Sequence, residues 1–336
     1  MRTGQVAIGI GRRQFISALG GATVAWPLAA RAQQSMPLVG FIHGGAAVAF
    51  AGRIAAFRAG LGEEGYVESQ NVLIEYHWLE GHFELLPTVL ADLIRHRVAV
   101  IATPGSTPAS IAAKAATATL PIVFGVGEDT VALGIEASLA HPGGNATGIN
   151  FFVNEIDAKR LGLMHELLPK ATRFAVLVNP ADATSADTTS KTLKEAAHTL
   201  GLDIHFFSAS TPAEIDAAFT AITRDQSDAL FIASEGFFAS RASQFAALAA
   251  RDRLPASFTT SEMVKAGLLM SYGVDMADTF RQVGNYVGRI LKGETPADLP
   301  VQQPTRFGFA INMTTVKALG LEISPMLLAR ADEVIE

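Results

Sequence analysis

The sequence contains no cysteine, and charged residues occupy only 17% of its 336 positions. Without thiols the chain cannot form disulfide bonds, thiolate metal sites or a cysteine nucleophile, and it cannot carry a lipid on an N-terminal cysteine. The net charge of -6 argues against nucleic-acid binding, which normally requires a basic surface. These features exclude sulfur redox chemistry and leave no nucleic acid among the expected partners.

The motifs of several common enzyme classes are also missing. The chain has no Gly-x-Ser-x-Gly elbow, no phosphate-binding Gly-x-x-x-x-Gly-Lys-Ser/Thr loop, no His-Glu-x-x-His and no Gly-x-Gly-x-x-Gly after its first predicted strand. His77 and His82 are five residues apart, which suits neither a helix face nor a usual metal pair. We therefore predict no catalytic residue, no metal site and no cofactor.

Residues 1–32 have the three-part layout of an export signal. They contain four arginines and no acid, and Arg12-Arg13 is typical of the twin-arginine route. The apolar stretch from 16 to 30 is shorter than the roughly 20 residues that a membrane-spanning helix needs. A cleaved signal is therefore favoured over an anchor, with cleavage near Ala32 and the mature chain in the periplasm.

From Pro37 onward, short apolar runs alternate with amphipathic stretches at helical spacing. This alternation is typical of α/β lobes in which helices flank a parallel sheet on both faces. The order strand, Ala-rich helix, Leu-Pro, strand occurs twice, through Leu120-Pro121 and Leu254-Pro255, which indicates two similar Rossmann-like lobes. Thr211 to Glu214 also predicts a helix start with a capping box. The predicted strands are 38–42, 72–76, 98–102, 122–124, 174–178, 204–207, 229–233 and a short strand near 257.

Ligands of open parallel sheets bind beyond the carboxyl ends of the strands. Two lobes facing each other would place both sets of loops around one cleft, so we expect a small solute to bind there. The loops that follow predicted strands are 43–46, which contains Gly44, and 103–107, 125–130, 179–182, 234–238 and 259–262.

The loop before the helix at 108 offers donors for an anion. Gly105, Ser106 and Thr107 place backbone N–H groups and two hydroxyls at a helix start, where a solute carboxylate could bind. Asn179 could offer its amide to the same group. Ordinary helix capping by Ser106 or Thr107, and a simple turn at Asn179, are the alternatives.

Two acidic residues are candidate partners for a solute ammonium group. A buried Asp129 would need an opposite charge, and Glu235 follows the corresponding strand of the second lobe. Asp129 could instead cap the next helix. Phe237, Phe258 and Tyr272 lie near the predicted cleft, where they would stack on an aromatic solute or enclose an aliphatic one, unless they pack in the core.

Several ordered segments resemble the exported solute-binding components of ABC transporters, in the family that includes the tryptophan-binding type. The resemblance covers about residues 36 to 336. The segments are PLVGF at 37–41, FRAGL at 57–61, GYVE at 65–68, Asn71-Val72 with Glu75-Tyr76, PIVF at 121–124, PGGNATG at 142–148, GLLMSYG at 267–273 and GRILKGE at 288–294.

This resemblance implies a type I periplasmic-binding-protein fold. Residues 36–148 plus about 274–302 would form the first lobe, and 149–273 plus about 303–336 the second, joined by a hinge. The implied protein is a monomer that closes on a small solute, an amino acid or an aromatic or small carboxylate, and presents it to the membrane subunits of an ABC permease. A Rossmann-like enzyme and a sensory ligand-binding domain that signals to a receptor are the alternatives.

Overall fold

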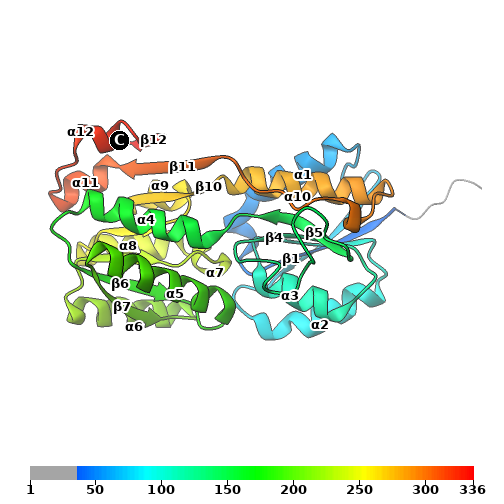
Figure 1. Ribbon diagram of the computed structural model, residues 1–336, viewed down its shortest axis with the longest axis horizontal. Coiled ribbons are helices and arrows are strands. Elements are labelled where there is room, and N and C mark those ends of the chain that lie inside the picture. The colour runs from blue at the N-terminus through cyan, green and yellow to red at the C-terminus, as the bar shows by residue number, and fades with distance from the viewer. Residues whose placement is uncertain (1–35) are drawn as a thin grey trace, which may run out of the picture. The chain divides into compact units, whose positions relative to one another are not determined.

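The computed structural model describes residues 36–336 (Figure 1). The predicted export signal at 1–32 lies outside the described residues. Within the described range, no helix combines the length and the apolar character needed to cross a bilayer.

The first lobe contains a five-stranded parallel sheet in the order β2-β1-β3-β4-β5. Apolar side chains on one face pack against α1 and α10, and those on the other face pack against α2 and α3. We call the sheet and these four helices the first lobe. Its elements are β1 (Leu38–His43), α1 (Ala51–Glu63), β2 (Leu73–Trp78), α2 (Leu86–Arg95), β3 (Val100–Pro104), α3 (Thr107–Ala116), β4 (Ile122–Val126), β5 (Ala146–Asn150) and α10 (Met276–Leu291).

The second lobe contains a seven-stranded sheet in the order β12-β11-β10-β9-β8-β6-β7, parallel except for the β10–β11 pair. Helices α4 and α5 cover one face, and α6 and α8 cover the other. The elements are α4 (Val153–Leu167), β6 (Arg173–Val178), α5 (Ala183–Leu200), β7 (Asp203–Ser208), α6 (Pro212–Asp225), β8 (Ala229–Ile232), α7 (Gly236–Ala239), α8 (Ala242–Asp252), β9 (Ala256–Phe258), α9 (Ser261–Ala266), β10 (Met270–Val274), β11 (Phe307–Asn312), α11 (Met313–Leu319), α12 (Pro325–Leu328) and β12 (Glu333–Ile335).

The chain passes between the lobes three times. It leaves the first sheet after β5 and enters α4, it returns from β10 to α10, and it crosses again between Gln302 and β11 (Figure 1). The first and third crossings lie side by side. The N–H of Gln302 donates to the carbonyl of Gly148 at 2.9 Å, and the N–H of Asn150 donates to the carbonyl of Gln302 at 2.8 Å. Because the chain leaves the second lobe after β10 and re-enters it at β11, these two neighbouring strands run antiparallel.

Local signals in the sequence account for several helix ends. The hydroxyl of Thr211 accepts the N–H of Glu214 at 3.2 Å, as the predicted cap requires. The carboxylate of Glu214 reaches one residue further back than a standard capping box and accepts the N–H of Ser210 at 2.6 Å. Gly201 ends α5 in the left-handed conformation, with φ of 70°.

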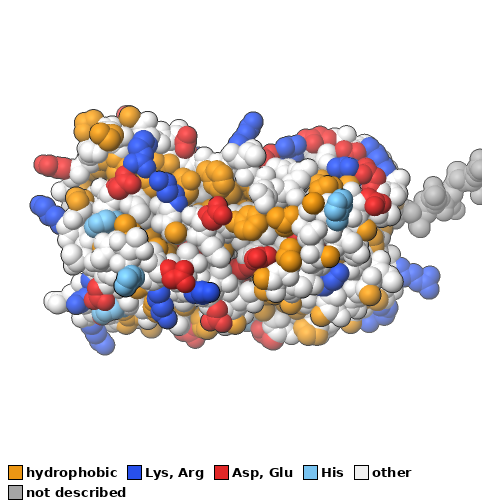
Figure 2. All heavy atoms as spheres, in the orientation of Figure 1, with side chains coloured by type: hydrophobic (Ala, Val, Ile, Leu, Met, Phe, Trp, Pro, Cys, Tyr) orange, Lys and Arg blue, Asp and Glu red, His pale blue; other side chains and the backbone are white. Residues whose placement is uncertain are grey.

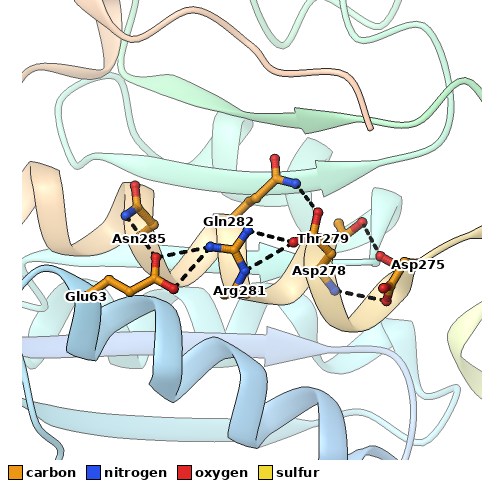
Figure 3. A network of polar contacts seen from close by, with 7 residues as sticks. All are labelled: Glu63, Asp275, Asp278, Thr279, Arg281, Gln282 and Asn285. Carbon is orange, nitrogen blue, oxygen red and sulfur yellow. Dashed lines mark hydrogen bonds and ion pairs between the residues drawn. The ribbon is translucent and has the colours of Figure 1, made fainter. Parts of the chain in front are cut away.

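Helix α10 packs tightly on α1 directly after the return crossing. A side-chain atom at Gly284 would overlap the carbonyl oxygen of Phe57, so only glycine permits this approach. At the edge of the contact, Arg281 pairs with Asp278 at 2.6 Å and with Glu63 at 3.1 Å (Figure 3). These contacts place α10 firmly in the first lobe, although its sequence follows a strand of the second.

Candidate functional site

A pocket with a cavity volume of about 50 Å³ lies between the loops of the two lobes. This volume is well below the roughly 300–1,000 Å³ that is usual for small-molecule sites, so the lobes lie tightly closed over the pocket. The residues that line it are His43, Phe50, Arg53, Gly105, Thr107, Gly127, Glu128, Phe151, Val153, Asp182, Ser185, Ser234, Glu235, Gly236, Ala239, Phe258, Thr259, Thr260 and Met276.

Three buried carboxyl groups line this pocket, and we call them the acidic cluster: Glu128, Asp182 and Glu235. Glu128 follows β4, while Asp182 and Glu235 are the N-cap residues of α5 and α7. Asp182 accepts the N–H of Ser185 at 3.2 Å. Glu235 accepts the N–H groups of Phe237 and Phe238 at 2.8 and 2.5 Å.

Burial makes ionisation of this cluster costly. It raises the pKa of Asp182 to about 7, and nearby Glu128 adds to the rise while the hydrogen bonds from Ser185 oppose it. Burial also raises the pKa of Glu235 to about 8, against the N–H hydrogen bonds that it accepts from the start of α7. A cationic group in the pocket would relieve this cost.

Within residues 36–336, the cationic side chain that lines the pocket is Arg53 of α1. Its guanidinium lies 4.8 Å from the centroid of the Phe50 ring and 3.6 Å from the carboxylate of Glu262 in the second lobe. Burial lowers the pKa of Arg53, partly offset by Glu262. A guanidinium placed in this way suits a solute carboxylate.

His43 at the end of β1 is a neutral wall of the pocket. Its Nδ1 accepts the N–H of Gly45 at 2.9 Å, which assigns the ring proton to Nε2. Burial lowers the pKa of His43 to about 3, and the nearby Arg53 contributes. The ring packs 4.1 Å from that of Phe50, so His43 supplies an apolar surface and one N–H donor without charge.

Direct contacts across the cleft close the pocket. The hydroxyl of Ser185 in the second lobe donates to Glu128 in the first at 2.6 Å. The N–H of Ala46 donates to the hydroxyl of Ser240 at 2.9 Å. The start of α7 thus lies against the loop after β1, and the structure represents the closed arrangement of the lobes.

Four of the residues singled out from the sequence line the pocket, and six do not. The first set is Gly105, Thr107, Glu235 and Phe258; the second is Gly44, Ser106, Asp129, Asn179, Phe237 and Tyr272. Residues in the second set lie behind the pocket wall, in the core or at the surface.

The expected burial of Asp129 is not observed. Asp129 is exposed and accepts the N–H groups of Val131 and Ala132, each at 3.0 Å, but residues 130–134 form a turn and not a helix, so the alternative of a helix cap is also wrong. The preceding residue, Glu128, has the buried position instead.

Ser106 does not cap α3, since its hydroxyl makes no capping hydrogen bond. That buried hydroxyl has no hydrogen-bond partner within 36–336 and lies 3.8 Å from where a side-chain atom at Gly44 would be. Asn179 is buried and accepts the N–H of Ala181 at 3.0 Å and the hydroxyl of Ser210 at 2.9 Å. Gly44, Ser106 and Asn179 are not among the residues that line the pocket.

Of the three aromatic candidates, one lines the pocket and two do not. Phe258 lines the pocket, while Phe237 is buried in the hydrophobic core of the second lobe, faces Gly81 of the first lobe and contacts the guanidinium of Arg241, 5.0 Å from its ring centroid. Tyr272 on β10 stacks on Phe307, with ring centroids 6.2 Å apart. Tyr272 therefore lies on an interior strand of the second sheet, between β9 and β11, and does not line the pocket.

Sequence reasoning missed the side chains that give the pocket its charge: Arg53, Glu128 and Asp182. Glu128 and Asp182 lie within loops that the strand pattern had marked, so the rule on strand ends could have found them. Arg53 lies on a helix whose other side packs in the core, and no local signal distinguishes it.

Two α/β lobes that close on a buried pocket define a two-lobed solute-binding protein. The family description "ABC transporter substrate binding protein" matches residues 46–335, and the chain belongs to this family. The family resemblance and the fold class expected from the sequence are thereby confirmed. The family consists of solute-binding proteins, which also supports the prediction that the chain is not an enzyme.

Three proteins similar to this chain are known by sequence or structure. A tyrosine-binding protein of Clostridioides difficile (strain R20291) is 25% identical over 266 residues, which are 79% of this chain and 76% of that protein. The structure of an ABC domain in complex with L-Trp from Streptococcus pneumonia has a TM-score of 0.78 at 24% identity, covering 90% of this chain and all of that one. A conserved domain protein from Vibrio cholerae has a TM-score of 0.80 at 26% identity, and the match covers 89% of this chain and 99% of that one.

Figure 2 shows that acidic and basic side chains are interspersed over the visible face of both lobes, without a continuous basic patch. This face therefore lacks the concentration of positive charge that nucleic-acid binding uses.

Proposed function

We propose that the pocket binds an α-amino acid as a zwitterion, with an aromatic amino acid as the leading solute. The observation that carries this proposal is the charge distribution, with the acidic cluster and Arg53 lining one buried pocket. The acidic cluster would bind the ammonium group, while Arg53 and the N–H groups at the start of α3 would bind the carboxylate. Relatives named for tyrosine binding and solved with L-Trp support the same class.

Closure of the two lobes is the proposed mechanism. Glu128 and Arg53 belong to the first lobe, whereas Asp182 and Glu235 belong to the second. A zwitterion that contacts both sets is satisfied only when the lobes meet, so the solute favours the closed state by its differential affinity. No chemical step is involved.

In the cell, the protein would be the exported solute-binding component of an ABC importer. We propose that residues 1–32 are removed near Ala32, and that the mature monomer delivers its solute in the periplasm to the permease membrane subunits. A sensory domain that signals to a receptor is the alternative. Stimulation of ATP hydrolysis by the reconstituted transporter, only with both solute and this protein present, would favour import.

The direct test is calorimetric titration of residues 33–336 with four probes. L-tryptophan and L-tyrosine carry both charges, 3-phenylpropionate lacks the ammonium group, and phenethylamine lacks the carboxylate. We expect only the amino acids to bind well, and at 100 times the dissociation constant they should stabilise the fold by about 2.7 kcal/mol. Equal binding of 3-phenylpropionate would refute the role of the acidic cluster.

Two adjacent residues provide a matched pair of variants. Glu128→Gln keeps the shape of a pocket-lining side chain but removes its charge, and we expect amino-acid affinity to fall about 10- to 100-fold, as for the loss of a hydrogen bond to a charged group. Asp129→Asn removes a charge one residue away, at the exposed turn, and should leave affinity unchanged. Equal effects of the two variants would contradict a local role for Glu128.

A further inference from the structure

The hydroxyl of Ser185 lies between two carboxyl groups. Its oxygen is 2.6 Å from an oxygen of Glu128 and 2.9 Å from one of Asp182. A serine hydroxyl carries one hydrogen and can therefore donate to only one of them. We assign this hydrogen to the shorter of the two contacts, the one with Glu128, which also accepts the hydroxyl of Thr107.

The contact between Ser185 and Asp182 then lacks a hydrogen unless Asp182 supplies it. With the Ser185 hydrogen donated to Glu128, a protonated Asp182 would donate to the lone pair of the Ser185 oxygen. Both contacts become hydrogen bonds, and one negative charge is removed from a place where three carboxyl groups are buried together.

No neighbouring cation within the described range neutralises Asp182. On α4, Arg160 is engaged by Asp157 at 3.2 Å, and both are buried. On α1, Arg53 lies beside Glu262 of α9. The remaining ionisable groups around the pocket add no positive charge, since Glu235 and Glu128 are acids, His43 is neutral and Glu136 is held by Thr130.

We propose that the empty closed pocket holds a proton between Asp182 and Ser185, and that the ammonium group of the solute displaces it, so that solute binding releases a proton. That an ammonium group displaces the proton rests on the proposed function. That a proton is present at all is inferred from the single hydroxyl hydrogen of Ser185, which lies between two carboxyl groups.

The direction of the pH dependence follows. Burial raises the pKa of Asp182 to about 7 in the empty pocket, and an adjacent ammonium would lower it toward its usual value. Between these two values, binding releases a proton, so the contribution of Asp182 makes affinity increase as pH rises and becomes constant above about 8. For Asp182 alone, the affinity at pH 8 should exceed that at pH 6 about tenfold. Glu235, whose pKa burial raises to about 8, would steepen the profile.

The first experiment is calorimetric titration of the mature protein with L-tryptophan in phosphate and in Tris at pH 7. The two buffers differ in ionisation enthalpy, so the difference in heat counts the protons released. Asp182→Asn replaces the proton by an amide that donates permanently to Ser185. This variant should release fewer protons and lose about the tenfold dependence attributed to Asp182. Asp129→Asn is the control and should behave as the wild type.

Binding of L-tryptophan without proton release between pH 6 and 8 would overturn the inference while leaving the proposed function intact. Full proton release by Asp182→Asn would also overturn it, because the proton would then come from another group.

A second arm needs no solute and so separates the two proposals. In the empty wild type, an acid with a raised pKa binds more protons when folded than when unfolded, so stability falls as pH rises toward 7. Relative to Asp182→Asn, the unfolding equilibrium constant should rise by up to about tenfold per pH unit between pH 5 and 7. Parallel profiles would refute the bound proton. If no amino acid binds, the proposed function fails and this comparison alone decides on the proton.

Discussion

Gly236 offers a way to obstruct closure with a single methyl group. A side-chain atom at this position would lie 3.0 Å from Cε1 of His43, 3.1 Å from the nitrogen of Gly45 and 3.4 Å from the carbonyl carbon of Gly44. Gly236 begins α7 in the second lobe, while all three neighbours belong to the first. A methyl group would therefore meet these atoms only when the lobes are closed.

The expected magnitude follows from these distances. Ordinary contact begins near 3.4 Å, so the closed state must relax by about 0.4 Å at the tightest contact. Overpacking by small groups costs about 1–3 kcal/mol, and a single methyl at a partly yielding contact belongs at the lower end. We expect Gly236→Ala to cost about 1 kcal/mol in the closed state only, which weakens solute affinity about fivefold.

Calorimetry with L-tryptophan measures the affinity, and small-angle scattering with and without the amino acid measures closure. Thermal unfolding without the amino acid reports on folding. Gly52→Ala on α1 is the control, because no atom lies within 4 Å of the added position. Wild-type affinity and compaction in Gly236→Ala would refute the reasoning, and so would an equal loss of affinity in the control.

Two further predictions concern stability and charge. Gly284→Ala would force α10 away from α1 and should lower the free energy of unfolding by about 2 kcal/mol. Gly162→Ala, with open space around it on α4, should leave the free energy of unfolding unchanged or raise it by up to about 1 kcal/mol. Urea denaturation compares the two variants, and equal losses of stability would refute the close-packing argument. Arg53→Gln should weaken L-tryptophan binding at least tenfold, yet leave the weak binding of phenethylamine unchanged, because phenethylamine has no carboxylate. Equal losses of affinity for both probes in calorimetry would show that Arg53 acts on closure rather than on the carboxylate.

The helices and strands were largely predictable because their causes are local. Apolar runs identified eight of the twelve strands in the described residues, but β5, β10, β11 and β12 were not predicted. Thr211 and Gly201 marked helix ends through capping and left-handed geometry. The antiparallel β10–β11 pair was not predictable in this way, because it depends on how the chain returns through the hinge.

The site was predictable only to the level of loops. The rule on strand ends correctly marked the segments with Gly105, Thr107 and Glu235, but it could not choose between Glu128 and Asp129. Their neighbouring positions are equivalent in sequence, and the direction in which the chain leaves β4 decides which one is buried. Likewise, Tyr272 was expected near the cleft, yet it lies in the middle of β10, stacks on Phe307 and does not line the pocket.

The sequence by itself determined the class of the molecule: two α/β lobes, an acidic chain without thiols, and loops that carry the contacts. Only the tertiary structure decided the electrostatics of the pocket. Glu128 and Ser185 are 57 residues apart, and Arg53 comes from a helix on the other side of the cleft from Asp182. Hydrophobic periodicity is a property of neighbouring residues, whereas a shared proton or a buried charge pair depends on which distant side chains meet when the lobes close.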